Sequence, residues 1–159
     1  MAQIQLRKVD NRDLPIFFSQ QLDPDAIHMA AFTTKDPSDL DAFNAHWQRI
    51  LNDPKIIIRT IEKDDVVVGY VLSYPEDGRQ EVSYWIGKEF WGQGITTSAL
   101  RIFLEEVNRT RPIFARVAKD NIGSIRVLEK CMFNVIGDEI GFASGRNREI
   151  PELLLERVD

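Results

Sequence analysis

Residues 81–100 read EVSYWIGKEFWGQGITTSAL, and this stretch decides the fold. Its first six residues are rich in β-branched and aromatic side chains and predict a strand. Gly92 and Gly94 then mark a tight turn, and an apolar helical pattern begins at Ile95. A strand, a glycine turn and a helix in this order predict free backbone N–H groups at the helix start, which bind anions such as a pyrophosphate.

Two common nucleotide motifs do not fit this turn. A P-loop has Gly-Lys-Ser/Thr after its glycines, whereas Gly94 is followed by Ile95-Thr96. A dinucleotide fingerprint has a third glycine or alanine where this chain has Thr97, and an acidic residue closing the second strand, where this chain has Val117-Ala118-Lys119. Taken alone, a Gly-x-Gly turn is as often a plain connection as a ligand loop.

Hydrophobic periodicity extends the pattern along the chain. Alternation predicts a strand at Ile4–Val9, and further strands are expected at Lys55–Glu62, Val66–Tyr74, Gln80–Ile86, Ile113–Val117, Phe133–Ile136 and Glu152–Arg157. Helical spacing predicts helices at about 12–22, from Pro37 to Leu51, at 95–108 and at 121–130. The order is β-α-α-β-β-β-α-β-α-β-β. It predicts a single α/β (α+β) domain over residues 1–159, with a mixed sheet that has helices on both faces, because the unit at 80–117 requires parallel pairing.

Capping residues and apolar stripes indicate where the helices begin and which faces are buried. Asp36 is the expected N-cap of the second helix, with Pro37 in its first turn. The side chains expected to be buried on the second and last helices are Leu40, Phe43, Trp47, Ile50, Leu51, Ile122, Ile125 and Leu128.

Composition excludes several classes of protein. The chain has 20 basic and 25 acidic residues and a net charge of −5, which disfavours a nucleic-acid binder. The single cysteine, Cys131, rules out an intramolecular disulfide and fits a cytoplasmic protein, and we expect its thiol to be buried. Two histidines and no cysteine pair make a structural zinc site unexpected. No apolar run is long enough to cross a membrane, and the N-terminus lacks the apolar stretch of a signal peptide.

A second motif lies at residues 121–133, NIGSIRVLEKCMF. Together with residues 81–100, it resembles the GNAT superfamily of N-acetyltransferases, and most closely the branch of ribosomal-protein N-terminal acetyltransferases. That branch has Glu-Ile-Gly-Tyr-Trp-Ile, then Trp-Gly-x-Gly, then Asn-x-x-Ser, Leu-Glu-Lys and Gly-Phe. Three positions depart from the wider pattern: Thr96 closes the loop, Met132 replaces a glycine, and Leu128 replaces a tyrosine that often acts as general acid.

The resemblance implies an acyl-CoA N-acyltransferase-like fold, acetyl-CoA as co-substrate and no metal. It implies that the co-substrate lies against Tyr84, Trp85, Ile86, Trp91, Gly92, Gln93, Gly94, Ile95, Thr96, Thr97 and Asn121. It also implies a general base at Glu81 and a proton donor to the thiolate at Ser124. For each of these polar residues a structural role stays open: an N-cap for Asn121, a solvent-facing charge for Glu81 and a small helix residue for Ser124.

The acceptor side is less defined. The acceptor is expected to be a primary amine, either a protein N-terminus or a small molecule, and a homodimer is possible. Candidate acceptor contacts, taken as a group, are Phe17, Phe18, Gln20, His28, Met29 and Phe32. Candidate contacts of the 3′-phosphate of acetyl-CoA are Arg101, Lys119 and Arg126. The alternative, suggested by Leu128, is a catalytically weak acyl-CoA-binding module of the same fold.

Overall fold

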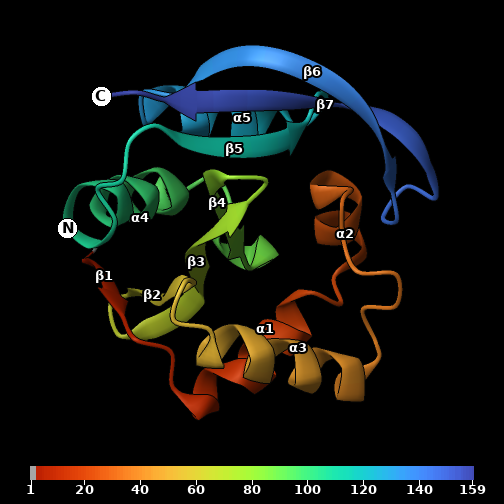
Figure 1. Ribbon diagram of the computed structural model, residues 1–159. Coiled ribbons are helices and arrows are strands. Elements are labelled where there is room, and N and C mark those ends of the chain that lie inside the picture. Colours follow the sequence, from red (N-terminus) through yellow and green to blue (C-terminus); the bar gives the residue numbers. More distant parts are fainter. Residues whose placement is uncertain (1–2) are drawn as a thin grey trace.

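Seven strands form one mixed sheet in this computed structural model, which describes residues 3–159 (Figure 1). They are β1 (Ile4–Arg7), β2 (Ile57–Lys63), β3 (Val66–Glu76), β4 (Arg79–Ile86), β5 (Ile113–Ala118), β6 (Asn134–Ala143) and β7 (Arg148–Arg157). Their order in the sheet is β1-β2-β3-β4-β5-β7-β6. All neighbouring pairs are antiparallel except β4 and β5, which are parallel as predicted.

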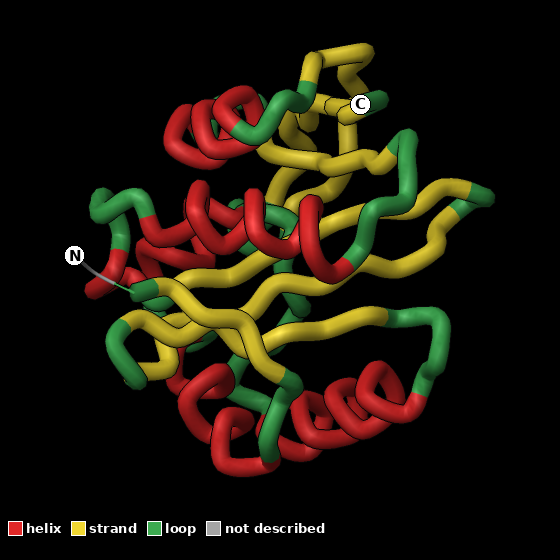
Figure 2. Tube along the Cα trace, turned by 90° about the vertical axis from the view of Figure 1, so that its left-hand side faces the viewer, coloured by secondary structure: helices red, strands yellow, loops and turns green. Residues whose placement is uncertain are grey.

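The helices cover both faces of this sheet (Figure 2). They are α1 (Leu14–Gln20), α2 (Pro24–Ala30), α3 (Leu40–Asn52), α4 (Ile95–Ile102) and α5 (Ile122–Lys130), with short turns η1 (Asn11–Asp13), η2 (Lys88–Phe90) and the π-helical η3 (Phe103–Val107). One core packs α4 and α5 against the sheet, and includes Leu100, Phe103 and Leu128. A second core, with Phe17 and Trp47, packs α1 and α3 against the other face.

The helix α2 corrects the predicted element order, because three helices rather than two precede β2. Asp23 caps it by accepting hydrogen bonds from the N–H groups of Asp25 and Ala26, and Pro24 occupies its first turn. Only Ala26 is buried, so this seven-residue helix carries almost no apolar stripe. In Figure 1 it stands apart from α1 and α3, beside the β6–β7 hairpin.

Several predicted details of the helices are wrong. Helix α3 begins at Leu40 with Asp39 as its N-cap, because Asp36 instead closes a turn by accepting from both N–H and Oγ of Ser38. Side chains expected in the core are exposed where the stripes reach helix ends: Leu40, Leu51 and Ile122. The other expected stripe residues are buried or half-buried, and Cys131 is buried as predicted.

The strands at the end of the chain are longer than predicted. β6 continues to Ala143 rather than ending at Ile136, and β7 begins at Arg148 rather than Glu152. Pairing with β7 holds the glycines and acidic residues of β6 in extended conformation, although these residue types disfavour strands. No helix within residues 3–159 is long and apolar enough to cross a membrane.

The strands β4 and β5 diverge, and a cavity lies between them. Their parallel ladder contains the single register pair Glu81 and Phe114, and beyond it the two strands separate. The remainder of β4, residues 82–86, pairs with β3 on one side and borders a cavity on the other.

Candidate active site

A cavity of about 670 Å³ lies between the separated strands. It is bordered by β4, the glycine loop (residues 90–94), the first turn of α4, α2, β5 and α5, so it unites the two sequence motifs in one place. All eleven residues that the resemblance assigned to the co-substrate line it, as does Ser124, whereas Glu81 is not part of the lining.

The glycine loop presents backbone to this cavity. Gly92 and Gly94 have φ of +77° and +75°, a region that L side chains rarely adopt, and a Cβ at either position would have no protein atom within 4 Å. Gly94 is also the N-cap of α4 and offers no side-chain acceptor. The N–H groups of the first helical residues therefore remain available to an anion, as the sequence predicts.

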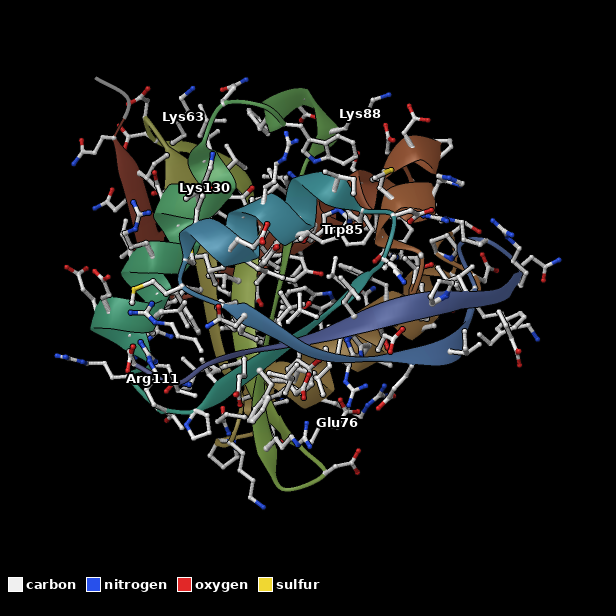
Figure 3. All side chains as sticks on the ribbon, turned by 90° about the horizontal axis from the view of Figure 1, so that it is seen from above. Lys63, Glu76, Trp85, Lys88, Arg111 and Lys130 are labelled. Carbon is white, nitrogen blue, oxygen red and sulfur yellow. The ribbon has the colours of Figure 1, made fainter. Side chains whose placement is uncertain are left out.

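Side chains fix the loop in place. The indole N–H of Trp91 donates to the carbonyl of Ile86 (2.9 Å), and Lys63 Nζ donates to Gln93 Oε1 (2.7 Å). Lys88 pairs with Asp25 of α2, and its label in Figure 3 lies on the α2 side of the molecule. Trp91 thus joins the loop to the end of β4 as well as bordering the cavity.

Two residues of the second motif are joined to their surroundings. Asn121 caps α5 by accepting from the N–H of Ser124 (3.2 Å), and its Nδ2 donates to the carbonyl of Met29 on α2 (3.1 Å). The hydroxyls of Ser124 and Tyr84 share a hydrogen bond of 2.5 Å. Burial raises the pKa of Tyr84 to about 12, so its hydroxyl keeps its proton at neutral pH. Leu128 is buried in the core beneath them.

Glu81 is buried, with 1% of its surface exposed, which is the opposite of a solvent-facing charge. Its Oε1 lies 3.5 Å from Arg116 Nε, whereas its Oε2 has no hydrogen-bond partner among residues 3–159. Burial raises the pKa of Glu81, and the nearby Arg116 charge offsets only part of this effect. A carboxylate with a raised pKa and an unused oxygen has the properties of a general base.

Arg116 gathers two further carboxylates that the sequence analysis missed. Its Nη1 lies 3.1 Å from Glu139 and 3.8 Å from Glu152. Arg116, Glu152 and Tyr74 border the same cavity. Arg116 could have been noticed in the sequence, because it is the charged residue in an otherwise apolar predicted strand. Glu139 could not, because it lies beyond the predicted end of its strand.

The predicted acceptor residues divide into two groups. Met29 and Phe32 border the cavity. Phe17 and Phe18 instead pack on Trp47 and Phe43, and Gln20 donates to the carbonyl of Val68 (3.1 Å). His28 does not border the cavity through its side chain, but its carbonyl accepts from Arg146.

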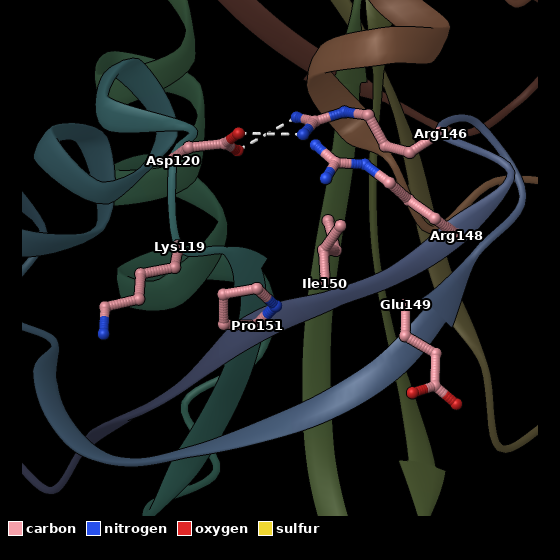
Figure 4. A pocket seen from close by; sticks show the side chains of 7 residues that line it. All are labelled: Lys119, Asp120, Arg146, Arg148, Glu149, Ile150 and Pro151. Atoms are coloured by element: carbon pink, nitrogen blue, oxygen red, sulfur yellow. Dashed lines mark hydrogen bonds and ion pairs between the residues drawn. The ribbon is translucent and has the colours of Figure 1, made fainter.

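The candidates for the 3′-phosphate also separate. Arg126 borders the cavity, and Arg101 donates to the carbonyl of Lys130. Lys119 lies in a second pocket of about 260 Å³ at the β6–β7 turn, where Arg146 makes a bidentate pair with Asp120 (2.8 and 2.9 Å; Figure 4). That pair joins the hairpin to the segment between β5 and α5, and the Arg146 bond to the His28 carbonyl joins it to α2. In residues 3–159, no group of three or more His, Cys, Asp or Glu side chains could hold a metal ion.

Comparison with known proteins agrees with this fold. A family model described as an acetyltransferase (GNAT) domain matches residues 3–134. A ribosomal-protein-alanine N-acetyltransferase from Brucella melitensis has a TM-score of 0.80 at 21% identity, covering 98% of this chain and 99% of that one.

Two further solved structures were determined with ligands. RimJ from Mycobacterium smegmatis, in complex with CoA-disulfide, has a TM-score of 0.81 at 19% identity, covering 98% of this chain and 81% of that one. Spermidine N-acetyltransferase from Vibrio cholerae, in complex with CoA and spermine, has a TM-score of 0.79 at 16% identity, covering 98% of this chain and 96% of that one. These likenesses show the fold. Comparison with curated protein sequences gives no match.

Proposed function

The chain belongs to the GNAT acetyltransferase family, and from this premise we propose that it transfers an acetyl group from acetyl-CoA directly to a primary amine. One observation carries the proposal: a single cavity extends from the free N–H groups of the glycine loop to Arg116 and Glu152, and the buried carboxylate of Glu81 lies 3.5 Å from Arg116 Nε. The first feature suits a pyrophosphate and the second suits an amine that must lose a proton.

The glycine loop and β4 would hold acetyl-CoA. Backbone N–H groups of residues 92–97 would bind the pyrophosphate, and the side of β4 that faces away from β3 would hold the pantetheine arm and the thioester carbonyl. The thioester supplies the acetyl group. Because the donors belong to the backbone, a chain with a net charge of −5 can bind a polyanion without a lysine patch.

Three side chains would move protons. Glu81 would accept the proton that the acceptor ammonium loses, directly or through water, and the freed amine nitrogen would form a bond to the acetyl carbon. As the C–S bond breaks, Ser124 would give its hydroxyl proton to the sulfur. Tyr84, hydrogen-bonded to Ser124, would return a proton to it, and the second proton that the nitrogen loses as the amide forms would pass through water to Tyr84. This pair would supply the acid that Leu128 cannot.

Two glycines provide a matched test of the co-substrate site. Gly78 in the β3–β4 turn has φ of +77°, close to that of Gly94, and an added Cβ would likewise meet nothing within 4 Å. Gly94→Ala and Gly78→Ala should therefore cost similar stability, about 1 kcal/mol. Only Gly94→Ala should weaken acetyl-CoA binding in calorimetry, by about tenfold or more, which is about 1.4 kcal/mol. Equal affinity of the two variants would remove the glycine loop from the binding site.

Turnover is tested by thiol release from acetyl-CoA with a panel of amino acids, short peptides and polyamines. We expect release with at least one class, and a loss of about 100-fold in kcat for Ser124→Ala, with Tyr84→Phe losing less. If acetyl-CoA binds but no amine is acetylated, the binding-module alternative replaces the enzyme.

A further inference from the structure

We infer that the acceptor carries a second positive charge, held by Glu139 and Glu152 beside Arg116 while its reacting amine lies at Glu81. The inference rests on the proposed function and narrows it, because it names a class of acceptor. It arises from four side chains that four adjacent strands bring to one face of the sheet: Glu81 of β4, Arg116 of β5, Glu152 of β7 and Glu139 of β6.

The cluster lacks positive charge. Three carboxylates surround one guanidinium, with separations from Arg116 of 3.5 Å for Glu81, 3.1 Å for Glu139 and 3.8 Å for Glu152. Arg79, which stacks on the Phe114 ring at 4.7 Å, also acts on Glu81, but Glu76 and Asp77 beside it oppose its effect. With all carboxylates ionised, the cluster around Arg116 carries a charge of −2.

Two features show that this arrangement is not a closed ion-pair network. Glu139 and Glu152 stand directly opposite each other in the β6–β7 register, a placement of like charges that destabilises a sheet. The buried Oε2 of Glu81 and Nε of Arg116 have no hydrogen-bond partner in the described chain. A cation bound here would relieve the repulsion, and an ammonium group would supply the missing donor to Glu81.

The cluster also reaches the cavity in which an acceptor would bind. Arg116, Glu152 and Tyr74 border the same cavity as Ser124 and the glycine loop, whereas Glu81 and Glu139 lie beside Arg116 outside its lining. Glu81 is five residues before the end of β4, about 17 Å along the strand from the turn that leads to the glycine loop. The side chains of Glu152 and Glu139 are 15% and 59% exposed, so the carboxylates lead from the buried Glu81 outward to solvent. When the reacting amine lies at Glu81, a second positive charge on the acceptor would therefore lie near Glu152 and Glu139.

The test uses pairs of acceptors that differ by one charge. The first pair is 1,4-diaminobutane and 1-aminobutane, and the second is the dipeptide amides Ala-Lys and Ala-Gln. We expect kcat/KM to be at least tenfold higher for the dicationic member of one pair, with the advantage falling as salt rises. An advantage confined to the diamine identifies a small-molecule acceptor, and one confined to the peptides identifies a protein N-terminus; either supports the inference.

Variants assign the effect to the cluster. Glu139→Gln and Glu152→Gln should reduce the dication advantage by three- to tenfold, mainly through KM. Glu149→Gln is the matched control, because Glu149 is exposed on the same strand and, three residues from Glu152, its side chain points to the other face of the sheet. It should leave the advantage unchanged.

Other outcomes overturn the inference. Equal kcat/KM within both pairs would do so, as would a preference for an acceptor that carries a carboxylate, which would make Arg116 an anion site. Binding of the four probes to protein saturated with CoA is measured in parallel by calorimetry. Absence of thiol release with every amine refutes the proposed function, whereas absence of a charge preference in binding refutes the second-charge site.

Discussion

Two buried carboxylates, Asp13 and Glu81, each lie beside an arginine, but the pKa of Asp13 is lowered and the pKa of Glu81 is raised. Asp13 is 2% exposed and Glu81 is 1% exposed, so their burial is the same. They differ in how many of their oxygens find partners. This difference separates a carboxylate that holds the fold together from one that is available for chemistry.

Asp13 is completely paired. Arg7 donates to both of its oxygens at 2.8 Å, and the N–H of Asp10 (2.9 Å) and the hydroxyl of Thr60 (2.7 Å) add two further bonds. Burial alone would raise the pKa of Asp13, but these donors outweigh it and lower the pKa. The network joins β1 and η1 to β2, so it fixes β1 at the edge of the sheet.

Glu81 is left open. Its contact with Arg116 is longer, at 3.5 Å, and Arg116 is shared with Glu139 and Glu152. Burial therefore dominates and raises the pKa. A buried carboxylate without full pairing costs stability, which a protein retains where function requires it. The comparison predicts that removal of the two charges has opposite consequences.

The largest effect is expected from Glu81→Gln. The amide keeps the size of the side chain but cannot accept the proton of the acceptor, so kcat should fall by about 10²- to 10⁴-fold in the thiol-release assay. Since the substitution removes an incompletely paired buried charge, Tm should stay the same or rise. Turnover at the wild-type rate would show that Glu81 is not the base.

The next effect is expected from Asp13→Asn, which should lower the free energy of unfolding by about 3 kcal/mol, measured by urea denaturation. The amide cannot accept all four bonds, and it leaves the Arg7 charge without its principal partner. The kcat per folded molecule should not change, because Asp13 does not line the cavity and its hydrogen-bond partners do not line it either. Arg12→Gln is the control: its pair with Asp10 is exposed, so we expect no measurable change in stability. A loss of activity without a loss of stability in Asp13→Asn would contradict the comparison.

The pH dependence should separate the two carboxylates further. Because the pKa of Glu81 is raised, the acidic limb of kcat/KM should lie above the ordinary value for glutamate, and Arg116→Met should move it to still higher pH. Asp13 acts in the opposite sense. Its lowered pKa contributes stability above the ordinary value for aspartate, and this stability is lost as the pH falls through the lowered pKa. Rate and unfolding profiles recorded over one pH range would test both directions, and a limb that Arg116→Met leaves in place would contradict the role of Arg116.

The sequence predicted the part of the molecule that depends on local patterns. Local sequence patterns identified all seven strands, and the two glycines identified the loop, in which both have positive φ angles. Met132, noted because it replaces a glycine, has φ of +72°. Helix α2 was missed because its cap and first turn, Asp23 and Pro24, precede a segment with no apolar stripe.

The cluster around Arg116 could not be predicted for a different reason. Its members lie on four strands, and which face each side chain takes depends on the register of pairs formed far apart in sequence. Glu139 lies in a stretch of β6 with glycines and acidic residues, and only pairing with β7 makes it a strand. These tertiary contacts determine whether a buried carboxylate is fully or incompletely paired. The sequence therefore allowed two interpretations of Glu81, a general base and a solvent-facing charge.

The smallest effect is expected from Asp25→Asn, which tests whether pairing matters without burial. Asp25 pairs with Lys88, and the pKa of the carboxyl is lowered chiefly by that bond, yet both side chains are largely exposed to solvent. Water screens an exposed pair, and holding two long side chains in place costs entropy. We therefore expect no measurable shift in Tm and no change in acetyl-CoA affinity, although the pair joins α2 to the turn before the glycine loop. A clear loss of stability would mean that pairing alone accounts for Asp13, and that the contrast with Glu81 does not depend on burial.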